Sequence, residues 1–245
     1  MKKFVYALLL LCVVLMGVRV AMAWNEVGEH TDKVWLHRCN SLQKFDEKHA
    51  DYPHIEVDLV YHNNGVFDVT HDSLESIHLS LAAYFEKVQH DTTKMWLDVK
   101  NLSEINKQAM KHSLDSLLQH YGIDKKRLII ESRNWQALEI FTRGGYFTSC
   151  YVDYDKPSRL SDAEKEAALK HLQGVVNSHK VCALSFPGWW YDDIKEAFAR
   201  QPIALLTWEH RKTQLELFLT PRGRRMINDP QLKVVLVKDK GHFHR

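Results

Sequence analysis

Three carboxylates occupy positions in the first 100 residues from which they could share one site. Glu56 and Asp58 lie two residues apart in one short apolar run, and Asp98 lies in a later run. Because side chains alternate between the two faces of a strand, Glu56 and Asp58 share a face. An all-oxygen set of this kind suits a hard divalent cation, Mg²⁺ or Ca²⁺. The sequence therefore predicts metal ligation by Glu56, Asp58 and Asp98.

Two histidines and two basic residues accompany these carboxylates. His37-Arg38 ends the first apolar run, His71 ends the third, and Lys100 lies two residues after Asp98. An imidazole accepts and donates protons near neutral pH, so His37 and His71 are candidates for a general acid and base. Arg38 and Lys100 carry charges that neutralise phosphate oxygens. Each group alone also has a structural interpretation, such as an ordinary Asp98–Lys100 ion pair.

The elements that must position these residues alternate between short apolar strands and helical patterns. The predicted strands are Val34–His37, His54–Val60, Val66–His71, Met95–Val99, Leu128–Glu131, Ser149–Val152, Val181–Leu184, Ile203–Trp208 and Val234–Val237. Helical patterns cover residues 41–50, 76–89, 103–120, 134–143, 161–177, 190–200 and 212–219. Ser103 and Ser161 stand where N-caps are expected, and Ser161 with Glu164 fits a capping box.

This alternation indicates βαβ units and a parallel sheet. Eight units with one extra hairpin strand fit a single-domain α/β fold, the (β/α)₈ TIM barrel, and chemistry in that fold occurs at the carboxyl ends of the strands. Trp208 ends a strand and is expected to line the pocket, while Glu131 and Arg133 could extend the polar site. The alternative is an open doubly wound sheet, although no G-x-G-x-x-G follows the first strand.

The N-terminus has the pattern of a secretory signal peptide. Lys2 and Lys3 precede an apolar run, and Ala21-Met22-Ala23 offers small residues for cleavage. We expect residues 1–23 to be a signal peptide, residues 24–245 to be the barrel domain, and the protein to be exported, either periplasmic or secreted. An uncleaved membrane anchor is the alternative, but Arg19 makes the apolar run short for a membrane span.

Composition sets limits on the class of protein. The 245 residues are 45% hydrophobic and 26% charged, with a formal net charge of +2, which excludes a disordered chain and gives no global attraction for nucleic acid. The chain has 15 histidines, a count that by itself identifies no site. Cleavage after Ala23 would leave three cysteines, Cys39, Cys150 and Cys182, so at most one internal disulfide could form.

In order and spacing, these motifs resemble the phosphatidylinositol-phospholipase-C-like phosphodiesterase superfamily, and within it the glycerophosphodiester phosphodiesterases. That family has a strand ending in His-Arg, a Glu-x-Asp strand, a turn with Gly before His-Asp, and a later strand with an acidic-x-Lys pair. The corresponding residues here are His37-Arg38, Glu56-Val57-Asp58, Asn64-Gly65 with His71-Asp72, and Asp98-Val99-Lys100. The resemblance covers residues 33–101 and weakens beyond them.

The resemblance implies a phosphodiesterase that uses one divalent cation and cleaves a lipid head group or glycerophosphodiester. It implies His37 and His71 as acid and base, Arg38 and Lys100 as phosphate contacts, and the three carboxylates as metal ligands. The expected partner is a small phosphodiester or phospholipid head group; transient membrane-surface contact is compatible with this, and no nucleic acid or protein partner is expected.

Several departures from the family's pattern keep an alternative open, among them Asp98 in place of the more usual Glu at the third acidic position. Cys39 replaces the usual Gly after His-Arg, and Asp72 and Leu97 are too close to admit the subdomain usual in glycerophosphodiesterases. Compact relatives are similar instead: sphingomyelinase D enzymes share the His-x-x-Asn of His37 to Asn40, and so do the menorin-type proteins. The alternative function is a catalytically silent barrel that acts as a binding or surface protein.

Overall fold

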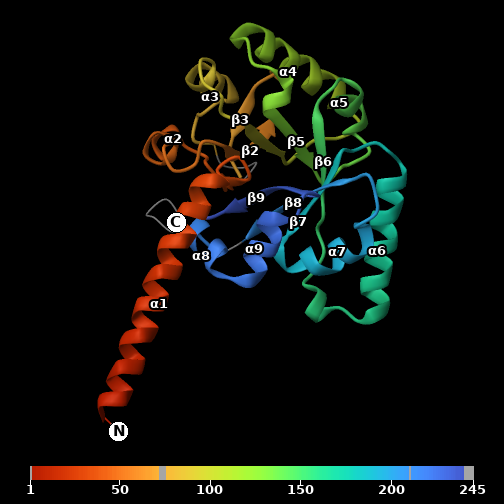
Figure 1. Cartoon of the computed structure of the whole chain (residues 1–245). Helices are drawn as coiled ribbons and strands as arrows, with labels where there is room; N and C mark the ends of the chain where they lie inside the picture. The colour runs from red at the N-terminus through yellow and green to blue at the C-terminus, as the bar shows by residue number, and fades with distance from the viewer. Residues whose placement is uncertain (1, 72–75, 210, 240–245) are drawn as a thin grey trace.

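A closed barrel of eight parallel strands forms the centre of the molecule (Figure 1). The computed structural model describes residues 2–71, 76–209 and 211–239. Strand order is β1-β9-β8-β7-β6-β5-β4-β2, and pairing of Leu36 with Ile55 joins β1 to β2 and closes the ring. The strands are β1 (Val34–Leu36), β2 (Ile55–Tyr61), β4 (Met95–Val99), β5 (Leu128–Ser132), β6 (Phe147–Tyr151), β7 (Ala183–Pro187), β8 (Ala204–Glu209) and β9 (Leu232–Val237).

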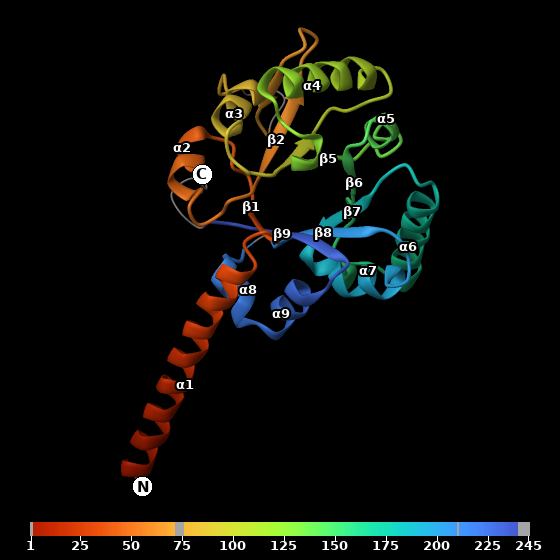
Figure 2. The same cartoon turned by 45° about the horizontal axis from the view of Figure 1, so that its top comes forward.

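Helices connect successive strands and surround the barrel, as the two views show (Figure 2). Strand β3 (Phe67–Val69) forms an antiparallel hairpin with β2 and is the predicted extra strand. The connecting helices are α2 (Leu42–Lys48), α3 (Leu81–Val88), α4 (Lys107–Tyr121), α5 (Glu139–Arg143), α6 (Asp162–Asn177), α7 (Tyr191–Phe198), α8 (Gln214–Leu219) and α9 (Pro221–Asn228). This arrangement confirms the predicted (β/α)₈ fold and excludes the open doubly wound sheet.

Alternation along the strands divides the apolar residues into two sets. One set packs between the strands and the helices and forms the large core. The other is a smaller cluster from the intervening strand positions, and it fills the interior of the barrel: Trp35, Trp96, Ile129, Ala183, Leu206, Trp208, Val234 and Leu236. The polar inward positions nearer the carboxyl ends of the strands therefore have an apolar floor beneath them.

Local signals placed most elements correctly, but α3, α4 and α5 begin four or five residues later than predicted, and one helix was not predicted. The capping box of Ser161 and Glu164 is present at the start of α6, as predicted. The predicted N-cap at Ser103 is wrong: α4 begins after Asn106, whose side chain bonds back to the Ser103 backbone instead. Helix α9 was not predicted, because Pro221 and Gly223 interrupt the helical pattern in the sequence although Pro suits the first turn of a helix.

Helix α1 (Lys2–Glu29) precedes the barrel and projects away from it (Figure 1). Its last turns pack against α8, where Ala23 and Val27 are buried. The Arg19 side chain contributes to this contact, since Nη2 donates a hydrogen bond to the Phe218 carbonyl oxygen at 2.5 Å. By length and composition α1 could cross a membrane, a test that signal sequences near an N-terminus also pass.

Candidate active site

The eight residues predicted to form the site line one small pocket at the carboxyl ends of the strands. The pocket has a volume of about 80 Å³ and is lined by His37, Arg38, Glu56, Asp58, His71, Asp98, Lys100, Glu131, Arg133, Tyr151, Trp208 and Leu236. Asp72, the second residue of the predicted His-Asp pair, lies outside the described residues. The structure thus brings together the eight predicted residues, of which the first, His37, and the last, Trp208, lie 171 positions apart in the chain.

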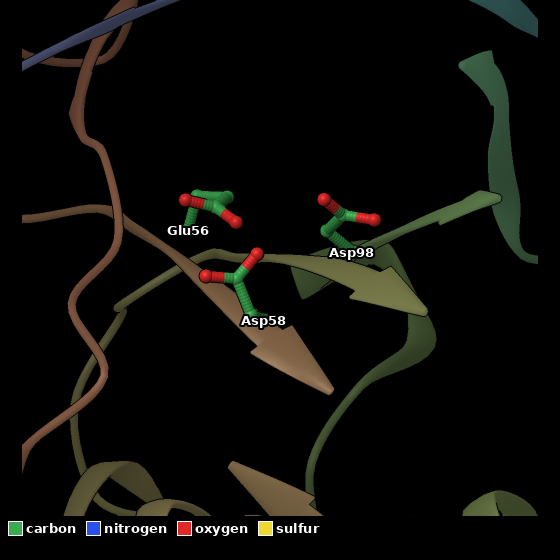
Figure 3. A group of neighbouring side chains, drawn as sticks. All are labelled: Glu56, Asp58 and Asp98. Atoms are coloured by element: carbon green, nitrogen blue, oxygen red, sulfur yellow. The ribbon is translucent and has the colours of Figure 1, made fainter. Parts of the chain in front are cut away.

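Strand register brings the carboxylates together. Asp58 pairs with Asp98 across β2 and β4, and Asp98 pairs with Glu131 across β4 and β5. One carboxylate oxygen from each of Glu56, Asp58 and Asp98 lies within 4.8 Å of the others, and the three side chains point toward a common space (Figure 3). Their exposed fractions are only 2%, 1% and 9%. The spacing and all-oxygen chemistry fit a hard divalent cation.

The loop that follows β1 has an unusual backbone conformation at Arg38. Arg38 has φ 52°, in the left-handed region that non-glycine residues seldom adopt. This turn directs its backbone N–H to Glu56 Oε2 at 2.6 Å. Buried Lys44 secures the loop from the other side, since its ammonium donates to the carbonyl oxygens of His37 at 3.1 Å and Arg38 at 2.9 Å.

Asn40 holds Asp58 with two hydrogen bonds. Its Nδ2 donates to Asp58 Oδ2 at 2.7 Å, and its Oδ1 accepts from the Asp58 backbone N–H at 3.0 Å. Cys39, between this residue and Arg38, is fully buried, and burial raises the pKa of its thiol to about 12. Tyr84 donates a hydrogen bond to the Cys39 carbonyl oxygen. The Cys39 side chain belongs to the core and does not line the pocket.

Positive groups border the carboxylates. The Lys100 ammonium contacts Asp58 Oδ1 at 2.5 Å and also bonds to Asp98. Arg38 is more exposed; its Nε lies 3.8 Å from Asp58 Oδ2, and its Nη2 lies 2.8 Å from His71 Nε2. His37 Nε2 lies 3.7 Å from Glu56 Oε2. Each predicted acid–base residue therefore has a charged neighbour at the rim of the carboxylate cluster.

Burial and neighbouring charges shift the pKa of these carboxyl groups in different directions. Burial, with repulsion from Asp58 and Asp98, raises the pKa of Glu56 well above its usual range. Burial also raises the pKa of Asp98, and Lys100 only partly opposes this effect. For Asp58 burial acts in the same direction, but Lys100, Asn40 and Arg38 together hold its pKa below the usual value. A cation among these carboxylates would favour the charged form of all three.

Glu131 is a further carboxylate in the pocket, one that the sequence marked only as able to extend the polar site. It is 2% exposed, and its Oε1 makes no hydrogen bond to any described residue. Burial, with repulsion from Asp98, raises its pKa well above the usual range. Tyr151, stacked on Trp208 at 5.0 Å between ring centroids, completes this wall with Arg133. Two residues near the site were not predicted: alternation on β6 could have identified Tyr151, whereas nothing in the sequence marks Lys44.

Comparison with known proteins supports the fold. No family model matches the sequence, and neither do any of the curated proteins compared. Among solved structures, a glycerophosphodiester phosphodiesterase from Parabacteroides distasonis has a TM-score of 0.56 at 13% identity, covering 84% of this chain and 93% of its own. A phosphodiesterase from Oleispira antarctica, solved with the product sn-glycerol-3-phosphate, has a TM-score of 0.55 at 17% identity over 84% and 92%. At these identities the likeness shows a common fold, in agreement with the resemblance found in the sequence.

Proposed function

We propose that the protein is a divalent-cation-dependent phosphodiesterase that cleaves a glycerophosphodiester or the phosphodiester of a lipid head group. The observation that carries this proposal is the pocket itself, where three buried carboxylates within metal-binding distance adjoin two histidines and the basic side chains of Arg38 and Lys100. The fold shared with glycerophosphodiester phosphodiesterases supports it.

Glu56, Asp58 and Asp98 would hold the cation, and Mg²⁺ and Ca²⁺ are the candidates. When bound, such an ion supplies Lewis-acid polarisation of a phosphoryl oxygen. Arg38, with a side chain 43% exposed, and Lys100 supply the positive charge that binds the remaining phosphate oxygens and stabilises the charge that develops on them.

His37 and His71 exchange protons with the reacting oxygens. One imidazole accepts the proton of the attacking hydroxyl as the new P–O bond forms, and the other donates a proton to the leaving oxygen as the old P–O bond breaks. The attacking hydroxyl is either water, which gives hydrolysis, or a neighbouring substrate hydroxyl, which gives a cyclic product. Analysis of products by ³¹P NMR separates these two courses.

A substrate screen tests the proposal. The full chain, kept dispersed in mild detergent, is incubated with glycerophosphocholine, lysophospholipids and an aryl phosphodiester, with Mg²⁺, with Ca²⁺ and with chelator. We expect metal-dependent turnover that His37→Ala abolishes. His112→Ala, which changes an exposed histidine on α4, is the matched control and should retain activity. Absence of both turnover and metal binding would favour the silent barrel.

We further propose that the N-terminal segment directs export. The expected cleavage point after Ala23 lies inside α1, at a residue fully buried against α8. Cleavage would remove Arg19 and its bond to Phe218, whereas a retained segment would act as an anchor. The mass of the protein recovered from its native membrane and soluble fractions distinguishes a free, cleaved protein from an anchored one.

A further inference from the structure

A second, larger cavity adjoins the candidate active site. Its volume is about 530 Å³, and it shares Trp208, at the end of β8, with the catalytic pocket. Four basic residues line it together with a single carboxylate, Glu209: Lys156, Arg211, Lys212 and Lys238. These cations come from the segments that follow β6, β8 and β9, so the cavity opens at the same end of the barrel as the catalytic pocket.

Glu209, the carboxylate that lines the cavity, is already paired with two basic side chains. Glu209 Oε1 lies 2.8 Å from Arg222 Nη1, and its Oε2 lies 3.3 Å from Lys212 Nζ. Across residues 2–71, 76–209 and 211–239, no carboxylate lies within ion-pair distance of Lys156, Arg211 or Lys238. The Lys156 ammonium instead lies over the Trp189 ring, 4.8 Å from its centroid. The cavity therefore has an excess of positive charge.

One of these cations, Lys238, is close enough to Arg38 of the catalytic pocket for their charges to repel each other. Lys238 is partly buried, and burial together with the charge of Arg38 lowers the pKa of its ammonium. Its backbone N–H donates to the Lys212 carbonyl oxygen at 3.0 Å, which ties the two basic segments together. Neighbouring like charges repel one another and favour an anion between them.

We propose that this cavity binds a second phosphate group of the substrate while the scissile diester occupies the catalytic pocket. The inference rests on the proposed phosphodiesterase function and specifies its substrate class as diesters whose head alcohol carries a phosphomonoester. Arg211 and Lys238 bind the phosphate oxygens, and Trp208 separates the two anionic groups. Lys212 is partly engaged with Glu209 and contributes less.

Kinetics with matched substrates tests this assignment. One glycerophosphodiester carries a phosphomonoester on its head alcohol, and the other is identical but lacks it. We expect kcat/KM to be at least about tenfold higher for the phosphorylated diester, since a hydrogen bond to a charged group contributes about that factor or more.

The double variant Arg211→Gln/Lys238→Gln should lose this preference and leave turnover of the plain diester unchanged. The control Lys126→Gln removes an exposed lysine elsewhere and should retain the preference. Equal kcat/KM values for the two diesters in the wild type would overturn the proposal, as would an equal loss on both in the double variant.

Binding of inorganic phosphate separates failure of this site from failure of the phosphodiesterase function. By calorimetry the wild type should bind two phosphates per chain, one beside Arg38 and Lys100 and one in the cavity. Arg211→Gln/Lys238→Gln should bind one, with an unchanged melting temperature. If two phosphates bind but no diester is cleaved, the cavity assignment stands and the proposed function fails. A single phosphate that the double variant still binds overturns the cavity assignment whatever the activity.

Discussion

Asn40 offers the sharpest test of how the site is built. Its side chain contacts Asp58 twice, once with the carboxylate and once with the backbone N–H. Asn40→Ala removes both hydrogen bonds. The bond to the charged carboxylate and the bond to the backbone N–H together contribute about 2–4 kcal/mol to the free energy of unfolding. For a chain of this length that loss lowers the melting temperature by roughly 5–15 °C.

The same substitution should weaken metal binding. Asp58 would lose the group that orients its carboxylate, and loss of such an outer partner typically reduces metal affinity about 10–100-fold. Urea unfolding of the metal-free protein measures the first effect, and calorimetric titration with Mg²⁺ or Ca²⁺ measures the second.

Asn106→Ala is the matched control for this experiment. Asn106 is also half-buried and makes two hydrogen bonds of 2.8 Å, to the Ser103 N–H and to the Asn101 carbonyl oxygen, but it lies outside the pocket. We expect Asn106→Ala to be less stable than the wild type and to bind the metal with unchanged affinity. If Asn40→Ala binds metal as tightly as the wild type, or if both variants lose affinity equally, the reasoning that Asn40 positions Asp58 as a ligand is wrong.

Three further predictions follow from the pocket and its surroundings. Because burial raises the pKa of Glu131, the native chain keeps a proton there at pH values above about 4, where the unfolded chain releases it. The contribution of Glu131 to stability is therefore fully present below about pH 4 and is lost as pH rises through the raised native pKa. In chelator, the free energy of unfolding of Glu131→Gln should exceed that of the wild type by a margin that grows with pH, and a constant margin would contradict this. Mg²⁺ or Ca²⁺ at 100 times its dissociation constant should stabilise the wild type by about 2.7 kcal/mol, and Asp98→Asn should lose most of that gain in thermal unfolding. A Cβ on Gly188 would lie 2.5 Å from Glu209 Oε1 and 3.2 Å from the Trp208 carbonyl oxygen, so Gly188→Ala should destabilise the protein by about 1–3 kcal/mol, whereas Gly174→Ala, with open space around it, should not.

The strand pattern made the fold and much of the site predictable. All nine strands lie within a few residues of their predicted positions, because short apolar runs between helical patterns are typical of the buried strands of a parallel sheet. The helix boundaries were predicted less accurately. The start of α4 was wrong because Asn106 bonds backward to the Ser103 and Asn101 backbone, a local choice that helical periodicity does not specify.

The sequence by itself determined which residues could do chemistry. His37, Arg38, Glu56, Asp58, His71, Asp98, Lys100 and Trp208 were all identifiable from residue type and position relative to strand ends, and all line one pocket. Residue type and strand period are local properties, so they can be recognised from a single amino-acid sequence.

Only the tertiary structure decided how those residues act on one another. Lys44 reads as a surface residue in its helix, yet it is buried and holds the loop of His37 and Arg38. Cys39 reads as a disruption of the motif, yet it packs in the core. Barrel closure also sets the cavity of Arg211 and Lys238 beside the catalytic pocket, with which it shares Trp208. Burial, pKa and charge neighbourhood depend on contacts between distant segments, which the register of a closed barrel determines.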